Sequence, residues 1–262
     1  MTSPSFDSLG LAEPILRNLA QAGFAQPTPI QAGAIPSLMA GRDLLGIAQT
    51  GTGKTAAFAL PILHRLAADP IRVKPYGARA LILAPTRELA VQIETEFRRF
   101  SASLRLKSAI ILGGVGRQPQ VSRMAQGMDN VVGTPGRICD LMSTGHLQIG
   151  KISHFVIDEA DRMLDLGFIR DIRRIVGALP VQRQSMLFSA TMPTEIAKLA
   201  EGLLRDPVRI EIAPNAPPAD RIEQHVHFVA TAEKRGHQYA AAIECLSDLV
   251  CTALRAGEHD DA

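Results

Sequence analysis

Short runs of apolar, often β-branched residues recur along the chain, and segments with helical spacing lie between them. The runs predict strands at 43–48, 80–84, 108–112, 130–132, 154–157, 185–188 and 208–212. Helices are predicted at 13–22, 31–39, 54–66, 86–100, 118–126, 137–144, 170–178 and 194–204. Because the strand segments are largely apolar without alternating, both faces of the sheet are expected to be buried, as in a parallel sheet with crossover helices. The pattern predicts an α/β fold with a helical layer on each side of the sheet.

The composition changes at residues 213–220 (APNAPPAD), where three prolines fall within eight residues. We interpret this segment as a linker. The α/β domain then spans residues 1–212, and a short carboxyl-terminal extension spans 221–262. The extension has a predicted strand at 223–229 and an alanine-rich helix at 238–254. It is too short for a second α/β domain of the same kind.

Charge and composition exclude some classes of protein and leave others open. The formal net charge of the 262 residues is +2, so the chain as a whole has no strong attraction to nucleic acid. Residues 97–137, however, contain seven basic residues and one acidic residue. No apolar run is long enough to span a bilayer, the amino terminus lacks a signal core, and the three cysteines form no paired motif. We therefore expect a cytoplasmic protein with no membrane partner.

A glycine-rich segment, AQTGTGKT at residues 48–55, lies between a predicted strand and a predicted helix. Gly51 and Gly53 let the backbone curl so that N–H groups point inward, and the helix adds its positive dipole end. Lys54 can reach the terminal phosphates of a nucleoside triphosphate, and the Thr55 hydroxyl can ligate Mg²⁺.

Ala48 stands where the phosphate-binding motif usually has its first glycine, so the backbone at this position must adopt angles that alanine tolerates. The alternative is a glycine-rich turn with a surface lysine. The predicted cofactor-binding residues are Gln49, Thr50, Gly51, Thr52, Gly53, Lys54 and Thr55.

The acidic segment DEAD, at residues 158–161, follows the apolar run HFVI directly. Asp158 and Glu159 are therefore expected at the carboxyl end of a buried strand, the edge of a parallel sheet where the glycine-rich segment also lies. Asp158 is predicted to hold Mg²⁺, largely through water, together with Thr55. Glu159 is predicted to orient or deprotonate the attacking water, so the catalytic set is Glu159, Lys54 and Asp158. A solvated helix start enriched in acidic residues is the alternative.

Seven segments follow one another in a recognisable order along residues 6 to about 212. They are GFAQPTPIQ (23–31), AQTGTGKT (48–55), PTRELA (85–90), GG (113–114), TPGR (134–137), DEAD (158–161) and SAT (189–191). In these segments the sequence resembles the amino-terminal RecA-like domain of DEAD-box RNA helicases. The resemblance implies a three-layer RecA-like P-loop NTPase fold with a mostly parallel sheet. It also implies ATP and Mg²⁺ as cofactors and ATP hydrolysis coupled to RNA binding.

The first of these segments predicts which base is bound. The Gln31 amide can donate to and accept from the Hoogsteen edge of adenine, which favours ATP over GTP. Phe24 can lie against the base, and Phe6 stands where the family has a supporting aromatic residue. Without the resemblance, Phe24 is an ordinary core residue and Gln31 an ordinary helix residue.

The remaining segments resemble the family's RNA-contacting set. The turns at 86–87 and 134–137 each open a predicted helix and can present N–H groups to phosphates, while Gly113 and Gly114 permit close backbone approach. Such contacts read RNA shape and backbone rather than bases, so no DNA specificity is expected. Loop and cap chemistry is the alternative for each turn. The resemblance also implies that Ser189 and Thr191 form hydrogen bonds near Asp161 and couple the nucleotide site to RNA. The predicted RNA-binding residues are Pro85, Thr86, Arg87, Gly113, Gly114, Thr134, Pro135, Gly136 and Arg137.

Members of this family have a second RecA-like domain that completes the ATP site with arginines, and no segment after residue 213 resembles its motifs. We therefore expect the chain to bind ATP, to hydrolyse it slowly and to lack unwinding. A second RecA-like domain in cis or in trans is implied as a partner. Two functions remain open: an ATP-dependent RNA helicase or its amino-terminal half, or a truncated, non-enzymatic module that binds ATP and RNA. A small-molecule kinase is disfavoured because it leaves the DEAD and TPGR segments without a purpose.

Overall fold

The computed structural model describes residues 5–212, so the linker at 213–220 and the extension at 221–262, with its predicted strand and helix, lie outside the described residues. Seven strands form one sheet in the order β3-β4-β2-β5-β6-β1-β7, and each neighbouring pair is parallel. The α/β prediction is confirmed, and the described sheet is parallel throughout. The strands are β1 (Leu44–Ile47), β2 (Ala78–Leu83), β3 (Ser108–Ile111), β4 (Met128–Gly133), β5 (His154–Ile157), β6 (Gln184–Ser189) and β7 (Val208–Glu211).

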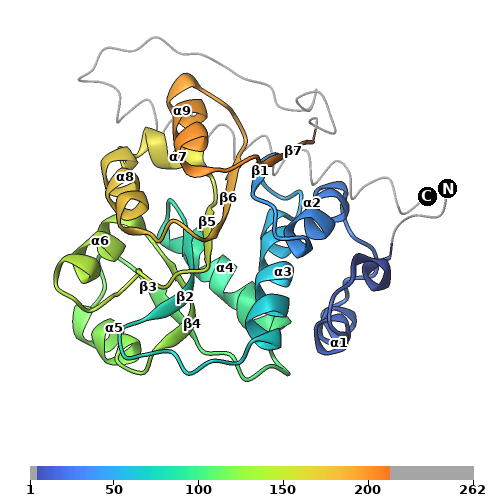
Figure 1. Ribbon diagram of the computed structural model, residues 1–262, viewed down its shortest axis with the longest axis horizontal. Helices are drawn as coiled ribbons and strands as arrows, with labels where there is room; N and C mark the ends of the chain where they lie inside the picture. Colours follow the sequence, from blue (N-terminus) through green and yellow to red (C-terminus); the bar gives the residue numbers. More distant parts are fainter. Residues whose placement is uncertain (1–4, 213–262) are drawn as a thin grey trace, which may run out of the picture. The chain divides into compact units, whose positions relative to one another are not determined.

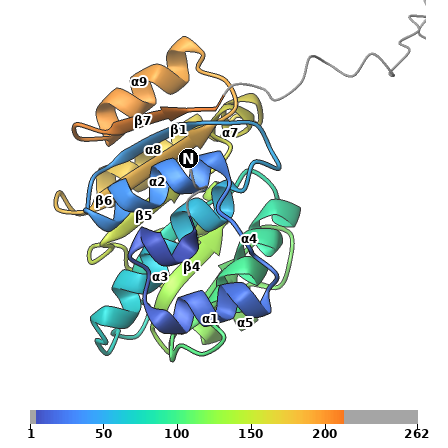
Figure 2. The same ribbon diagram turned by 90° about the vertical axis from the view of Figure 1, so that its right-hand side faces the viewer.

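Helices cover both faces of the sheet, as Figure 1 shows with α5, α6 and α8 on one side and α2 and α3 on the other. Figure 2, turned by 90°, shows α1 and α2 in front of the strands. Within residues 5–212 no helix combines the length and apolar character needed to cross a membrane. The first layer holds η1 (Phe6–Leu9), α1 (Glu13–Gln21), α2 (Pro29–Met39), α3 (Lys54–Ala68) and α4 (Arg87–Phe100). The second holds α5 (Arg117–Met124), α6 (Pro135–Ser143), α7 (Ala160–Asp165), α8 (Ile169–Ala178) and α9 (Thr194–Leu203).

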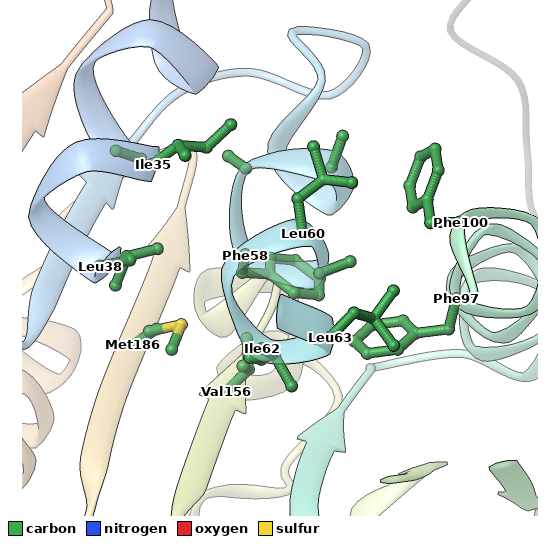
Figure 3. Close-up of a cluster of buried hydrophobic side chains, with 14 of the residues drawn as sticks. Ile35, Leu38, Phe58, Leu60, Ile62, Leu63, Phe97, Phe100, Val156 and Met186 are labelled. Carbon is green, nitrogen blue, oxygen red and sulfur yellow. The ribbon is translucent and has the colours of Figure 1, made fainter. Parts of the chain in front are cut away.

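Helix α3 lies at the centre of the first layer and is buried on most sides. Phe58 has no exposed surface, and its ring centroid lies 6.2 Å from that of Phe97 on α4 and 5.4 Å from that of Phe188 on β6. Ile35 and Leu38 of α2 face the same cluster from the other side (Figure 3). Because close-packed interiors transmit strain and resist movement, this packing holds the first turn of α3 firmly at the edge of the sheet.

Several elements differ from their predicted bounds. Two short helices, η1 and α7, were not predicted, because four and six residues are too few to show a helical period. Helix α6 begins at Pro135, two residues before the prediction, since proline fits the first position of a helix. Strand β4 begins at Met128, two residues before the prediction. It includes buried Asp129, which accepts a hydrogen bond from Arg79, and buried Asn130, which donates to the Ser108 hydroxyl.

His154 begins β5 at the amino edge of the sheet, and 7% of the residue is exposed. Burial, with Arg65 and Arg79 nearby, lowers the pKa of His154 from 6.5 to about 4. Between these two values the unfolded chain binds more protons than the folded chain, so stability falls as the pH falls. We expect His154 alone to lower the free energy of unfolding by about 2 kcal/mol between pH 8 and pH 5. His64, whose pKa burial also lowers, adds to the loss.

Urea unfolding at both pH values, for the wild type and for His154→Gln, measures this contribution. The variant should lose correspondingly less stability on acidification. His146→Gln, which changes a half-buried histidine in the turn after α6, is the matched control and should keep the full loss. An identical acid dependence in His154→Gln and the wild type would contradict the assignment.

Candidate functional site

The order of the strands divides the carboxyl edge of the sheet into two halves. In one half the neighbouring strands β5, β6 and β1 lead into residues 158–161, 189–191 and 48–55. In the other half β3, β4 and β2 lead into the loop at 112–116 and the segments 134–137 and 85–90. The predicted nucleotide residues and the predicted RNA residues therefore gather in two adjacent regions of one sheet edge, where parallel α/β folds bind ligands.

The glycine-rich segment curls as its sequence predicts. Gly51 and Gly53 both have positive φ, 84° and 92°, and Gly53 is the N-cap of α3. The Thr52 hydroxyl donates to the Gln49 carbonyl at 2.8 Å, which closes the turn. Ala48 is buried and is not among the residues with positive φ, so alanine is accommodated there without strain. We call residues 48–55 the cradle.

Lys54 and Asp158 meet at the cradle although they lie about a hundred residues apart in sequence. The Lys54 ammonium donates to the Ala48 carbonyl at 3.0 Å and lies 3.9 Å from Asp158 Oδ1, and both side chains are almost fully buried. Burial raises the pKa of Asp158 to about 6; Lys54 opposes this shift and Glu159 adds to it. A carboxylate that is costly to keep charged gains from a cation, so the site fits a divalent metal ion. Thr55, in the first turn of α3, is half-buried beside Lys54.

Glu159 has a strained backbone and a buried side chain. Its φ of 56° places it in the left-handed region, which is uncommon for a residue other than glycine, and it caps α7. Its Oε1 accepts a hydrogen bond from Thr50 of the cradle at 3.3 Å, while its buried Oε2 has no hydrogen-bond partner among residues 5–212 and lies 3.6 Å from Arg162 Nη1. The carboxylate thus contacts the cradle through Oε1, and Oε2 is left to accept a proton or a hydrogen bond from water.

Asp161 joins the end of β6 to the acidic segment. Its Oδ2 accepts hydrogen bonds from the Thr191 hydroxyl and backbone N–H, both at 2.8 Å, and from Ala190 N–H at 3.2 Å. Ser189 Oγ in turn accepts from the Asp161 backbone N–H at 3.2 Å. Burial would raise the pKa of Asp161, but the hydrogen bonds, chiefly from Thr191, hold it below the ordinary value. The structure therefore brings these three residues together; a coupling role for them stays a prediction.

Gln31 connects the segment at 23–31 to the cradle. It is 1% exposed, its Oε1 accepts from Thr28 N–H at 3.0 Å, and its Nε2 donates to the Gly53 carbonyl at 3.1 Å. A Cβ on Gly53 would lie 2.4 Å from Gln31 Nε2, so glycine is required for this approach as well as for its backbone angle. Sequence reasoning assigned Gln31 to the base and missed its two contacts within the protein.

Phe24 packs against aromatic neighbours. Its ring centroid lies 6.4 Å from that of Phe6 and 5.3 Å from that of Phe100, and the Arg99 guanidinium lies 5.5 Å above it. Phe6 and Phe24 line a cavity of 370 Å³ whose wall residues include neither Gln31 nor the cradle. The structure thus places Phe6 beside Phe24, and adenine contact by Phe24 stays a prediction.

Seven of the nine predicted RNA residues line one groove of 590 Å³ on the other half of the sheet edge, whereas Pro135 is buried at the start of α6 and is not part of its wall. Gly114 lies beside it, because a Cβ there would meet the Arg87 guanidinium. The wall also includes Leu166, which is 51% exposed, and Phe168. Both residues follow α7, a helix too short to be predicted, so their position in the groove could not be predicted from the sequence. The groove is lined by Pro85, Thr86, Arg87, Glu88, Gly113, Thr134, Gly136, Arg137, Leu166 and Phe168.

Hydrogen bonds fix the side chains around this groove. Thr86 Oγ1 accepts from Leu89 N–H at 3.2 Å, which caps α4. Arg137 donates to the Val115 carbonyl at 3.2 Å and pairs with Asp140 at 3.4 Å. Of the seven basic residues in the stretch 97–137, only Arg137 lines the groove. The other six do not line this groove; for example, Arg99 donates to the Ala22 carbonyl and Arg123 to the Ser108 carbonyl.

A parallel α/β sheet with this cradle, a lysine and paired carboxylates defines a P-loop nucleotide-binding domain. The family model described as DEAD/DEAH box helicase matches residues 28–199, so the chain belongs to this family. It is 41% identical, over 94% of its length, to "DEAD-box ATP-dependent RNA helicase 20" of Oryza sativa subsp. japonica, of which the match covers 49%. It is 38% identical, over 93% of its length, to "ATP-dependent RNA helicase dbp2" of Schizosaccharomyces pombe, of which the match covers 44%.

A solved structure agrees with the fold. The chain is similar to a DEAD box protein from the hyperthermophile Methanococcus jannaschii with a TM-score of 0.72 and 39% identity. This match covers 79% of the chain and 55% of the solved one. The RecA-like fold inferred from the sequence is thereby confirmed. The chain spans about half the length of the curated relatives that it matches.

Proposed function

We propose that this chain is the nucleotide-binding half of an ATP-dependent RNA helicase, which binds Mg·ATP at the cradle and single-stranded RNA in the groove. The observation that carries the proposal is the meeting of Lys54 and Asp158, 3.9 Å apart, at the sheet edge that also holds the groove. A nucleotide and an RNA strand bound there would contact loops that leave neighbouring strands. The family membership supports this assignment.

Four residues have distinct roles in this proposal. Lys54 binds the terminal phosphates as a point charge. Thr55 and Asp158 would hold Mg²⁺, which neutralises charge on the triphosphate when bound. Glu159 orients the attacking water and accepts its proton on Oε2, the oxygen that has no hydrogen-bond partner in the described residues.

Gln31 is suited to adenine even though both ends of its amide already form bonds. A glutamine amide has two N–H groups and two lone pairs on oxygen, and Thr28 and Gly53 use one of each. One donor and one acceptor remain among the described contacts, which is what the N7 and N6–H groups of adenine require, and because Gln31 is 1% exposed its side chain has to turn outward to meet the base. Guanine presents two acceptors at the same edge, so one of them would face the glutamine oxygen.

Replacing Gln31 with alanine should remove most of the preference for ATP over GTP. A good bidentate pair discriminates between bases by about 1–3 kcal/mol, so the ratio of the two affinities should fall by about tenfold. Fluorescence titration with Mg·ATP and Mg·GTP measures it, and urea unfolding accounts for the removal of the bonds to Thr28 and Gly53. Gln21→Ala, which changes an exposed glutamine at the end of α1, is the matched control. A preserved preference would mean that another group reads the base.

The groove suits a phosphate backbone rather than particular bases. Helices α4 and α6 both begin there, so their first N–H groups and their positive dipole ends face the same region. Arg87 and Arg137 add positive charge beside them. Because main-chain N–H groups contact phosphates in any sequence, the RNA contacts are expected to be independent of sequence.

A further inference from the structure

Gln120 holds both ends of one loop of the groove. It lies in the first turn of α5 and is 8% exposed. Its Oε1 accepts from Leu112 N–H at 2.9 Å, and its Nε2 donates to the carbonyls of Leu112 and Gly116, both at 3.0 Å. One buried side chain thus fixes the start and the end of residues 112–116, which we call the glycine loop because Gly113, Gly114 and Gly116 make up most of it.

The glycine loop contacts the other two walls of the groove. Gly113 N–H lies 3.4 Å from Thr134 Oγ1, and the Val115 carbonyl accepts from Arg137. Gly114, at φ 68°, lies against the Arg87 guanidinium. The backbone N–H groups of Gly114 and Val115 donate to no acceptor within the described residues. The position of the loop therefore determines where Gly113 lines the groove, and it is linked to both arginines of the groove.

We propose that Gln120 is a positioning residue for RNA binding, which holds the glycine loop in its phosphate-binding conformation before RNA arrives. This inference rests on the proposed function. Glycine has more backbone freedom to lose than any other residue, so an unclamped loop with three glycines would have to be ordered by the RNA itself. Ordering the backbone of one residue corresponds to about a tenfold loss of affinity. Nucleotide binding, on the other half of the sheet edge, does not need the clamp.

Gln120→Leu removes all three hydrogen bonds at nearly constant volume. Gln120→Glu keeps the acceptor for Leu112 N–H but places a carboxylate oxygen, which cannot donate, beside the carbonyls of Leu112 and Gly116. We expect both variants to bind a fluorescently labelled oligouridine about tenfold more weakly at low salt, with Mg·ATP affinity changed less than twofold. The slope of the logarithm of RNA affinity against the logarithm of salt concentration should fall by about 0.7 for each phosphate that the protein no longer neutralises. Amide hydrogen exchange should become faster in residues 112–116. Gln118→Leu, an exposed glutamine of the same helix turn, is the matched control and should bind RNA normally.

The outcomes separate this inference from the proposed function. Unchanged RNA affinity in both Gln120 variants would overturn the inference. So would a parallel loss of RNA and ATP affinity, which would mean that Gln120 only stabilises the fold. An Arg137→Ala variant tests the groove itself. If its RNA affinity equals that of the wild type, the groove is not the RNA site, and the proposed function fails together with the inference.

Discussion

Adding a carboxyl-terminal RecA-like helicase domain is expected to raise RNA-stimulated ATP hydrolysis by this chain by about 10³–10⁵-fold. An arginine supplied to a phosphoryl-transfer site stabilises the charge that develops in the transition state. Lys54 and Arg162 are cations near the proposed phosphate site, but Arg162 lies against the Glu159 carboxylate at 3.6 Å. The resemblance to the family implies that a second RecA-like domain supplies arginines to this site.

Phosphate release with oligouridine, measured with and without the added domain, tests this expectation. The control is the same domain with its site arginines replaced by alanine, which should bind but not stimulate. Stimulation by both forms of the domain would assign the effect to RNA clamping alone. Rapid hydrolysis by the chain without any added domain would contradict the arginine argument.

Much of this fold could be predicted because its strands are buried on both faces. Runs such as His154–Ile157 are apolar enough to mark a central strand, and the glycines of the cradle require a backbone that the structure contains. Parallel strands place their carboxyl ends at one edge, so Lys54 and Asp158 could be assigned to the same edge of the sheet from local pattern alone. The order of the strands did not, because pairing depends on contacts between distant segments. The position of β6 between β5 and β1 is visible only in the sheet, whereas the hydrogen bond from Thr191 to Asp161 was expected from the family resemblance alone.

The features that could not be predicted from the sequence are mainly hydrogen bonds between side chains and main-chain groups distant in sequence. Gln31 and Gln120 are ordinary helix residues by pattern, and their bonds to Gly53 and to both ends of the glycine loop leave no periodic signal. The left-handed backbone of Glu159 is likewise imposed by its surroundings, since local propensity disfavours it. The count of basic residues in 97–137 did not by itself indicate a site, and of the seven only Arg137 lines the groove, since residues close in sequence need not be close in space.

Replacing Glu159 with glutamine should lower ATP hydrolysis by about 10²–10⁴-fold while ATP affinity stays within about twofold. The amide has nearly the shape of the carboxylate, and its oxygen can still accept from Thr50, which lies 3.3 Å from Oε1. The amide cannot accept a proton from the attacking water, so general-base catalysis by Oε2 is lost. The substitution weakens the ion pair with Arg162, but the Arg162 side chain is exposed, so this pair contributes little to ATP affinity.

The measurement uses the chain with the added domain and RNA, so that the wild-type rate is high enough to show the full loss. Glu195→Gln, an exposed carboxylate that pairs with Arg173 and Lys198, is the matched control and should hydrolyse ATP normally. Full hydrolysis by Glu159→Gln would move the general base to another residue, and a loss of ATP binding would make Glu159 a structural residue. A variant that binds ATP without hydrolysing it also separates two forms of coupling. If it retains ATP-dependent RNA binding in the groove, then ATP binding drives RNA binding, and hydrolysis serves only release.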